Sequence, residues 1–313
     1  MKKLLALVLV AIMALGIVNL AVAEAPIKVG VCIYKFDDNF MTNYRNELEA
    51  YLTGKGAEVT TMDSKNDQAE QNNQINAFIA QGVDVLIINP VMSSAAASII
   101  ELAKAADIPL VLINRQPSDE DMDLWDNVCY VGCDARQSGT MQGNIILGTE
   151  NKGDFNGNGV VDYVMIIGDP ENVDAQYRTE FSIKALTDAG IQVNKLFEQR
   201  GDWAQEKGQE LAANALAQFG NEIDVIFCNN DGMALGALQS IQAAGRIVNK
   251  DIYLVGVDAL DEVVELVKAG EFTGTVLNDH IGQSHKAGDV ALEVAGGATP
   301  EKNYTVDYRK IVE

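Results

Sequence analysis

The sequence has little positive charge and few aromatic side chains. Its 313 residues include 23 lysines and arginines against 45 aspartates and glutamates, a formal net charge of −22. Nucleic-acid binders need a basic patch and proteins held on anionic lipid need a basic cluster, so both classes are disfavoured. Aromatic residues make up 6%, but 48% of residues are hydrophobic, which is enough to build a sizeable core. We interpret most of the acidity as a contribution to solubility.

Residues that carry catalysis are also scarce. The two histidines, His280 and His285, are five positions apart, so they do not share one face of a helix. The sequence contains no nucleophile elbow, P-loop, HExxH or GxGxxG fingerprint. We therefore expect a protein that is not an enzyme and has no catalytic residues. A glycoside hydrolase stays open as the enzyme alternative because carboxylates are abundant.

One long apolar run stands at the N-terminus. Residues 1–3 are Met-Lys-Lys, residues 4–18 are apolar, and residues 21–23 are Ala-Val-Ala. A basic start, a short apolar stretch and a small-x-small end are typical of a secretory signal peptide. The alternative is an uncleaved anchor, but the run is short for a spanning helix, which needs about 20 residues. We expect cleavage after Ala23 and a periplasmic location.

Cysteine is rare, with one residue each at Cys32, Cys129, Cys133 and Cys228. No CxxC or Cys/His metal spacing occurs among them. Three of the four lie in apolar, strand-like runs, where free cysteine packs as a small hydrophobe. We expect core packing, although export would permit disulfides.

Short β-branched runs alternate with amphipathic stretches over the remaining chain. The pattern predicts strands at 27–34, 58–63, 83–89, 108–113, 127–132, 163–168, 191–197, 224–229, 252–257 and 272–277. It predicts helices at 40–54, 68–81, 93–106, 135–149, 175–189, 203–219, 231–245, 260–269 and 281–296. Runs that are apolar on both faces are typical of parallel strands covered on both sides. The sequence therefore predicts an α/β protein with two doubly wound parallel-sheet lobes, because ten strands exceed one small sheet.

Polar side chains follow nearly every predicted strand. Ligands of open α/β sheets bind at the carboxyl ends of strands, so these residues are candidates for a site. Helix capping explains part of the pattern, because Asp and Asn are preferred N-caps. Capping does not explain Arg115, Arg178, Phe40 or Trp203. Carboxylates, amides and arginine suit the hydroxyls of a pyranose, and aromatic rings suit its apolar faces. Two lobes closing on such a ligand would exclude water.

Five segments together carry a family resemblance. They read YKFDDNFM, SKNDQAEQNNQINAFIAQGVD, NNDGMALGAL, VGVDAL and GTVLND. From about Ile27 to the end, the chain resembles the periplasmic galactose/glucose-binding proteins of sugar ABC importers. The resemblance implies the type I periplasmic-binding-protein fold, with two lobes joined by a three-segment hinge. It also implies a monomer that delivers a monosaccharide to a membrane permease, and often presents it to a chemoreceptor.

The resemblance also implies how the chain divides between lobes. The N-terminal lobe is expected to contain residues 24–133 and 279–300. The C-terminal lobe is expected to contain residues 134–278 and 301–313.

The family's sugar ligands carry over to residues whose motifs match here. Those implied to bind hydroxyls are Asp38, Asn114, Asp174, Arg178, Asn230, Asp258 and Asn278. Phe40 and Trp203 are implied to sandwich the ring. Asn172 is the tenth expected sugar contact and stands where the family usually has histidine, and Arg115 stands where the family has lysine. Because both replacements leave the exact sugar open, a pentose or autoinducer binder that acts mainly in sensing is the alternative. A repressor of this fold would need an N-terminal helix-turn-helix where the leader stands.

An oxygen-rich loop predicts a structural calcium site. Residues 154–162 fit the first nine positions of an EF-hand loop, with Gly159 at the sharp turn. Position 12 would be Met165, which cannot bind Ca²⁺, so a true EF-hand is excluded. The resemblance implies that a remote carboxylate, here Asp224, completes the site. The expected ligands are Asp154, Asn156, Asn158, the carbonyl of Val160, Asp162 and Asp224. A plain Asn-Gly turn is the alternative.

Overall fold

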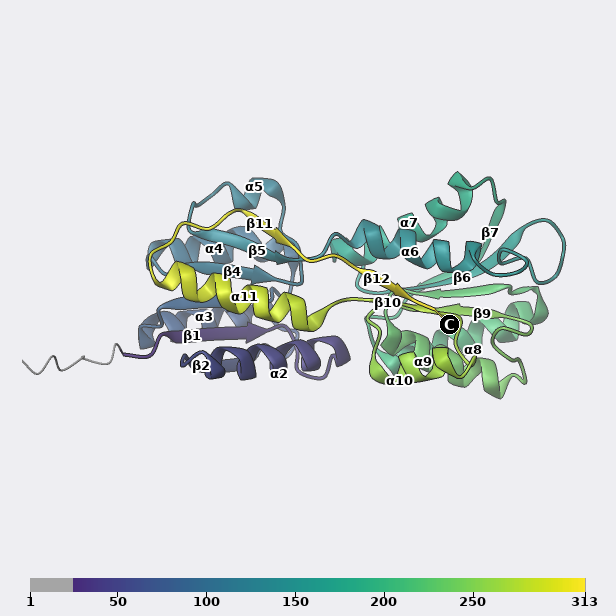
Figure 1. Ribbon diagram of the computed structural model, residues 1–313, viewed down its shortest axis with the longest axis horizontal. Helices are drawn as coiled ribbons and strands as arrows, with labels where there is room; N and C mark the ends of the chain where they lie inside the picture. The colour runs from purple at the N-terminus through teal and green to yellow at the C-terminus, as the bar shows by residue number, and fades with distance from the viewer. Residues whose placement is uncertain (1–24, 313) are drawn as a thin grey trace, which may run out of the picture.

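The computed structural model describes residues 25–312, which form two α/β lobes placed end to end (Figure 1). The first lobe has a six-stranded sheet in the order β11-β5-β4-β3-β1-β2. Its strands are β1 (Lys28–Ile33), β2 (Glu58–Asp63), β3 (Val85–Ile88), β4 (Leu110–Ile113), β5 (Val128–Gly132) and β11 (Asn303–Thr305). Its helices are α2 (Asn39–Gly54), α3 (Gln68–Gln81), η1 (Ser93–Ala95), α4 (Ala96–Ala105), α5 (Asp119–Met122) and α11 (His280–Ala295).

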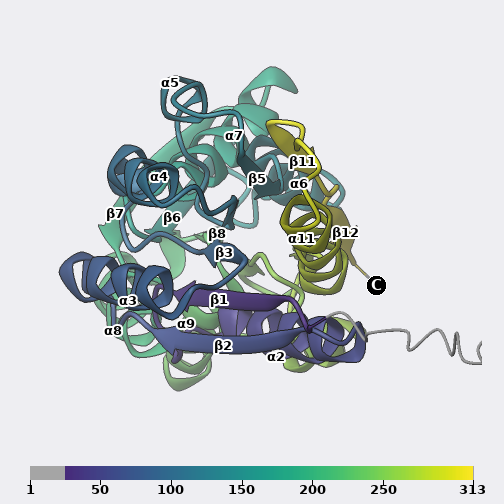
Figure 2. The same ribbon diagram turned by 90° about the vertical axis from the view of Figure 1, so that its left-hand side faces the viewer.

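Helices cover both faces of this sheet, which is why its central strands are apolar throughout. On one face, Val31 packs with Tyr44 of α2 and Val290 of α11. On the other face, Cys32 packs with Phe78 of α3 and with residues of α4. Figure 2 looks along the long axis and shows the first lobe in front of the second. The fully buried strands confirm the expected parallel, doubly covered sheet.

The second lobe repeats this plan around a four-stranded parallel sheet in the order β7-β6-β8-β9. Its strands are β6 (Val161–Ile167), β7 (Val193–Arg200), β8 (Val225–Cys228) and β9 (Tyr253–Val255). Its helices are α6 (Ala135–Leu147), α7 (Val173–Asp188), α8 (Gln205–Phe219), η2 (Gly220–Glu222), α9 (Asp231–Ala243) and α10 (Asp261–Lys268). Val164 and Ile226 face the α8–α9 side, whereas Met165 and Phe227 face the α6–α7 side.

The chain passes between the lobes three times. The crossings follow β5, β10 (Thr275–Leu277) and β11, and they contain Cys133, Asn278 and Tyr308. Strand β10 lies beside β9 through single bridges and pairs with β12 (Arg309–Ile311). The β10–β12 pair is antiparallel, which departs from the all-parallel expectation.

The expected assignment of residues 301–313 to the second lobe needs correction. Strand β11 pairs with β5 of the first lobe, with Asn303 opposite Tyr130. The last crossing therefore comes after Thr305, and only β12 joins the second lobe. The sequence pattern gave no sign of this, because β11 and β12 are three residues each and mostly exposed, so they lack a buried periodicity.

The other predicted elements are present within residues 25–312. Each of the ten expected strands and nine expected helices corresponds to an observed element, and the short helices α5 and η2 and the strands β11 and β12 are additional. All four cysteines are free and buried, as expected for core packing. No helix in the described range is long and apolar enough to cross a membrane. The predicted signal peptide at 1–23 lies outside the described residues.

Candidate ligand-binding cleft

The ten residues predicted to contact sugar line one cavity between the two lobes. The residues are Asp38, Phe40, Asn114, Asn172, Asp174, Arg178, Trp203, Asn230, Asp258 and Asn278. Tyr34, Met41 and Arg115 also line the cavity and were not among the expected ligands. Arg115 follows Asn114 directly, so its position in the sequence already pointed toward the site.

The wall from the first lobe is built around the start of α2. Asp38 caps this helix, and its Oδ1 accepts the backbone N–H of Met41 at 2.8 Å. The hydroxyl of Tyr34 donates to Asp38 Oδ2 at 2.6 Å. Asn114 adopts a φ of 63°, and Tyr130 holds its carbonyl through a hydrogen bond of 3.0 Å. These bonds fix Asp38 and Asn114 before any ligand enters.

The wall from the second lobe is built around the first two turns of α7. Asn172 caps the helix, and its Oδ1 accepts the N–H of Asp174 at 3.0 Å. The Asn172 oxygen is therefore used in capping, and its side-chain N–H₂ is the part left to donate to a ligand. Arg178 lies one turn after Asp174, with 3.4 Å between its Nη2 and Asp174 Oδ2. Arg178 also donates to the carbonyl of Asn229 at 2.8 Å and to the hydroxyl of Tyr308 at 3.1 Å.

Two buried polar atoms in this wall lack a hydrogen-bond partner among the described residues. They are Oδ1 of Asp174 and Nε of Arg178. The two residues are 5% and 4% exposed, so bulk solvent does not satisfy these atoms. Burial raises the pKa of Asp174, and the Arg178 guanidinium opposes that rise. An unpaired buried acceptor beside an unpaired buried donor is costly to keep, and a hydroxylated ligand would satisfy both.

Asp258 and Asn278 complete the hinge side of the cavity. Asn278 donates to Asp258 Oδ1 at 3.2 Å and accepts from Gln283 at 2.7 Å. Asp258 is buried, and its burial raises its pKa well above the usual carboxyl value, an effect that nearby Arg178 opposes. Asn278 belongs to the second crossing, so the site reaches directly into the hinge.

The two expected stacking rings come from opposite lobes. Phe40 belongs to α2 and makes an edge contact with His280, with 6.4 Å between ring centroids. Trp203 follows β7 and lies against Gly168 so closely that a Cβ there would meet the indole at 2.3 Å. Asn230 donates to the Trp203 carbonyl at 3.2 Å, which ties the ring to the start of α9. A ligand in the cavity would therefore have one aromatic side chain in each lobe.

The periplasmic binding protein domain matches residues 29–299 of this chain. The chain belongs to this family. It is 38% identical over 307 residues to the D-galactose/methyl-galactoside binding periplasmic protein MglB of Haemophilus influenzae, covering 95% of this chain and 90% of that protein. It is 34% identical to a putative rhizopine-binding protein of Rhizobium meliloti, covering 91% and 90% of the two chains.

Solved structures of the family share the fold. A solute-binding protein of an ABC transporter from Bacillus halodurans with bound myo-inositol has a TM-score of 0.80 and 26% identity, covering 93% and 96% of the two chains. A galactofuranose-binding protein has a TM-score of 0.83 and 23% identity, covering 92% and 95%. The family consists of non-enzymatic sugar-binding transport proteins, and its members are periplasmic.

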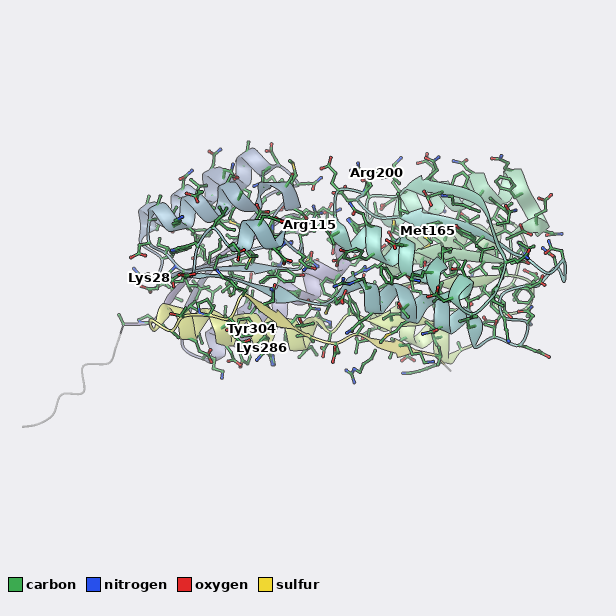
Figure 3. All side chains as sticks on the ribbon, turned by 90° about the horizontal axis from the view of Figure 1, so that it is seen from above. Lys28, Arg115, Met165, Arg200, Lys286 and Tyr304 are labelled. Carbon is green, nitrogen blue, oxygen red and sulfur yellow. The ribbon has the colours of Figure 1, made fainter. Side chains whose placement is uncertain are left out.

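An ion pair joins the lobes at the edge of the cavity. Arg115 Nη1 of the first lobe lies 3.5 Å from Asp169 Oδ2 of the second lobe. The Arg115 guanidinium also lies 4.2 Å from the Tyr34 ring centroid and donates to the carbonyl of Val91. Asp169 is shared with Arg200, also at 3.5 Å. Figure 3 shows Arg115 at the boundary between the lobes and Arg200 nearby on the second lobe.

Of the six residues predicted to bind calcium, hydrogen bonds link Asn156, Asn158, Asp162 and Asp224. No group of three or more His, Cys, Asp or Glu within residues 25–312 is placed to hold a metal ion. The backbone N–H of Asp224 donates to the Asp162 carbonyl at 2.8 Å, which brings Asp224 beside the loop before β6. Asp162 Oδ2 lies 2.9 Å from the side-chain amide of Asn158 and 3.3 Å from that of Asn156. Asp224 Oδ2 also lies 3.3 Å from the Asn156 amide. These amides point their N–H₂ groups toward the carboxylates, and a half-turn of each amide would bring its oxygen to the same place.

The two carboxylates of this cluster are buried. Asp162 and Asp224 are 7% and 0% exposed, and neither forms a salt bridge within residues 25–312. Burial raises the pKa of Asp224, and the Asp162 carboxylate raises it further. Both carboxylates accept hydrogen bonds: Asp224 from the backbone N–H groups of Phe155, Asn156 and Asp162, and Asp162 from the side-chain amide of Asn194. Both carboxylate oxygens of Asp154 accept hydrogen bonds from backbone N–H groups of the loop, including those of Gly157 at 2.8 Å and Gly159 at 3.0 Å.

Proposed function

We propose that this chain is an exported solute-binding protein that captures a monosaccharide between its lobes and delivers it to the permease of a sugar ABC importer. The unpaired Asp174 Oδ1 and Arg178 Nε carry this proposal, because both residues line the cavity between the lobes and a hydroxylated ligand there would supply the missing partners. The ten residues expected to contact the sugar are proposed as its binding site. The leader at residues 1–23 supports export to the periplasm.

Galactose or glucose is the proposed ligand. The 38% identical relative is described as a binder of D-galactose and methyl-galactoside. The cavity offers acceptors, amides, a forked guanidinium and two aromatic rings, which together match the edge and faces of a pyranose. Asn172 in place of histidine supplies a donor that does not titrate near neutral pH, so this contact should be insensitive to pH.

A polyol other than galactose or glucose is the second candidate ligand. Asn172 and Arg115 favour it because they replace the histidine and lysine that are usual in galactose/glucose-binding proteins. One relative is named as a putative rhizopine-binding protein and another as a ribose import binding protein, and one solved structure contains bound myo-inositol. The family therefore accommodates several polyols. A pentose or autoinducer ligand with a chemoreceptor as main partner belongs to this alternative. We propose a monomer that holds the ligand without catalysis, because the cavity's carboxylates are tied to Arg178, Tyr34 or helix caps.

We also propose that Ca²⁺ binds the loop at 154–162 together with Asp224. Asp154, Asn156, Asn158, Asp162 and Asp224 would supply side-chain oxygens, and Val160 would supply its carbonyl. When bound, the ion would supply charge that offsets the two buried carboxylates, and its role would be structural.

Titration calorimetry with a panel of sugars tests the proposed function. The purified chain should bind galactose or glucose more tightly than arabinose, ribose or myo-inositol. The variant Arg178→Lys should lose most affinity, since lysine cannot form the planar fork, whereas the exposed control Asp188→Asn should bind like the parent. Tight binding of a pentose or inositol alone would favour the second candidate. Release of product from a methyl-galactoside would refute a pure binding role.

A further inference from the structure

A buried carboxylate lies directly behind the sugar site without lining it. Asp231 is the first residue of α9 and follows the cleft residue Asn230. It is fully buried, and the cavity is lined by its neighbours rather than by Asp231 itself. The roles proposed so far leave this charged group unexplained, although burying a carboxylate is costly unless it serves as an acceptor.

The two oxygens of Asp231 bind two separate segments of the second lobe. Oδ1 accepts the hydroxyl of Thr275 at 2.7 Å, and Oδ2 accepts the backbone N–H of Leu260 at 3.0 Å. The backbone N–H of Asp231 donates to the Val257 carbonyl at 2.6 Å. Thr275 Oγ1 in turn accepts the N–H of Ala259 at 3.3 Å. Asp231 and Thr275 thus hold both ends of the turn that contains Asp258.

This turn has a backbone conformation that needs holding. Asp258 has a φ of 124° and Ala259 a φ of 53°, and neither residue is glycine. Such conformations persist only where the surrounding structure fixes them. The carboxylate is packed against the preceding strand, because a Cβ at Gly256 would lie 2.1 Å from Asp231 Oδ1. Thr275 starts strand β10, which ends one residue before Asn278, the hinge residue that donates to Asp258.

We infer that Asp231 is a positioning residue that sets the sugar-binding geometry of Asp258 and Asn278 through the Leu260 N–H and the Thr275 hydroxyl. This inference rests on the proposed function, because it concerns residues assigned to the sugar. Asp231 does not touch the ligand. Its hydrogen bonds hold the strained turn and the start of β10 in one arrangement.

Four variants separate positioning from simple stability. Asp231→Asn keeps one acceptor but replaces the other with a donor, so it should weaken sugar affinity by about tenfold. Thr275→Val removes the hydroxyl at nearly constant volume and should weaken affinity similarly, whereas Thr275→Ser should restore it. The control Asp67→Asn alters a helix cap in the first lobe, away from the cleft, and should bind normally.

Amide hydrogen exchange gives a readout that does not need sugar. The amides of Ala259 and Leu260 should exchange faster in Asp231→Asn and Thr275→Val, and Thr275→Ser should restore protection. If the parent protein binds no sugar in the panel, the proposed function fails, while the exchange rates still report on positioning. The inference is overturned if these amides keep parental protection, or if Thr275→Val and Thr275→Ser bind equally well. If Asp231→Asn does not fold, the two Thr275 variants still decide the question.

Discussion

Removing the charge of Asp169 should weaken ligand binding although Asp169 does not line the cavity. Its pair with Arg115 is the only salt bridge within residues 25–312 that spans the cleft away from the hinge. Asp169→Asn keeps an acceptor for the Glu171 N–H, which the carboxylate now accepts at 3.1 Å. The substitution therefore removes the charge and keeps intact the local turn that contains Glu171.

The size of the effect follows from the geometry. Two unit charges 3.5 Å apart attract by about 5 kcal/mol at an effective dielectric constant of 20. Desolvation offsets much of this, because Arg115 is 3% exposed when the lobes are closed. Asp169 also keeps Arg200 as a partner within its own lobe. We expect a net loss of about 1–2 kcal/mol from the closed state, which corresponds to about 5- to 30-fold weaker binding.

Stopped-flow tryptophan fluorescence with calorimetry would measure this loss. Because the pair forms on closure, the off-rate should rise more than the on-rate falls. Added salt should weaken the parent more than Asp169→Asn, and the exposed intralobe control Asp188→Asn should behave like the parent. An unchanged off-rate and dissociation constant in Asp169→Asn would refute a role for this pair in holding the closed state.

Three further predictions concern the other parts of the molecule. Trp203→Ala should weaken sugar binding more than tenfold and abolish the sugar-induced fluorescence change. The fluorescence is measured in a Trp125→Phe background so that the second tryptophan does not contribute. An affinity equal to that of the parent would disprove stacking of Trp203 on the sugar. Calcium chelation should lower the melting temperature of the parent but not of Asp224→Asn, and an unchanged melting curve with no metal by elemental analysis would exclude the site. Burial raises the pKa of Asp231 to about 7, so between about pH 4 and 7 the native carboxyl binds a proton that the unfolded chain has released. The contribution of this group to the free energy of unfolding should therefore fall as the pH rises through that range. Denaturant titrations at several pH values should show this pH dependence in the parent and not in Asp231→Asn. The same pH dependence in both proteins would contradict the prediction.

Most of the fold was predictable because the central strands of each sheet are buried on both faces. Runs such as Val85–Ile88 and Leu110–Ile113 must be apolar at every position, and that pattern is visible without knowledge of their neighbours. Strands β11 and β12 were missed because their partners are far away in sequence and their side chains remain mostly exposed. Local pattern carries no information about such pairings.

The contents of the cleft were predictable for a related reason. In parallel sheets all carboxyl ends meet at one edge, so the polar residues after each strand had to converge. Three of them, Asp38, Asn172 and Asn230, do cap helices, so the capping explanation and the site explanation hold together. The Arg115–Asp169 pair could not be predicted, because it depends on how closely the two lobes approach each other.

The path of the last residues has a consequence for how the protein is made. The edge strand of the first sheet and the partner of β10 both come from residues 303–311. The six-stranded sheet of the first lobe stays incomplete, and β10 lacks its partner β12, until nearly the whole chain has been synthesised. Contacts with such long sequence separation form slowly, because the entropy cost of closing the loop comes before the pairing stabilises the chain. Such late completion would suit the proposed export, in which the chain stays unfolded during secretion and folds afterwards.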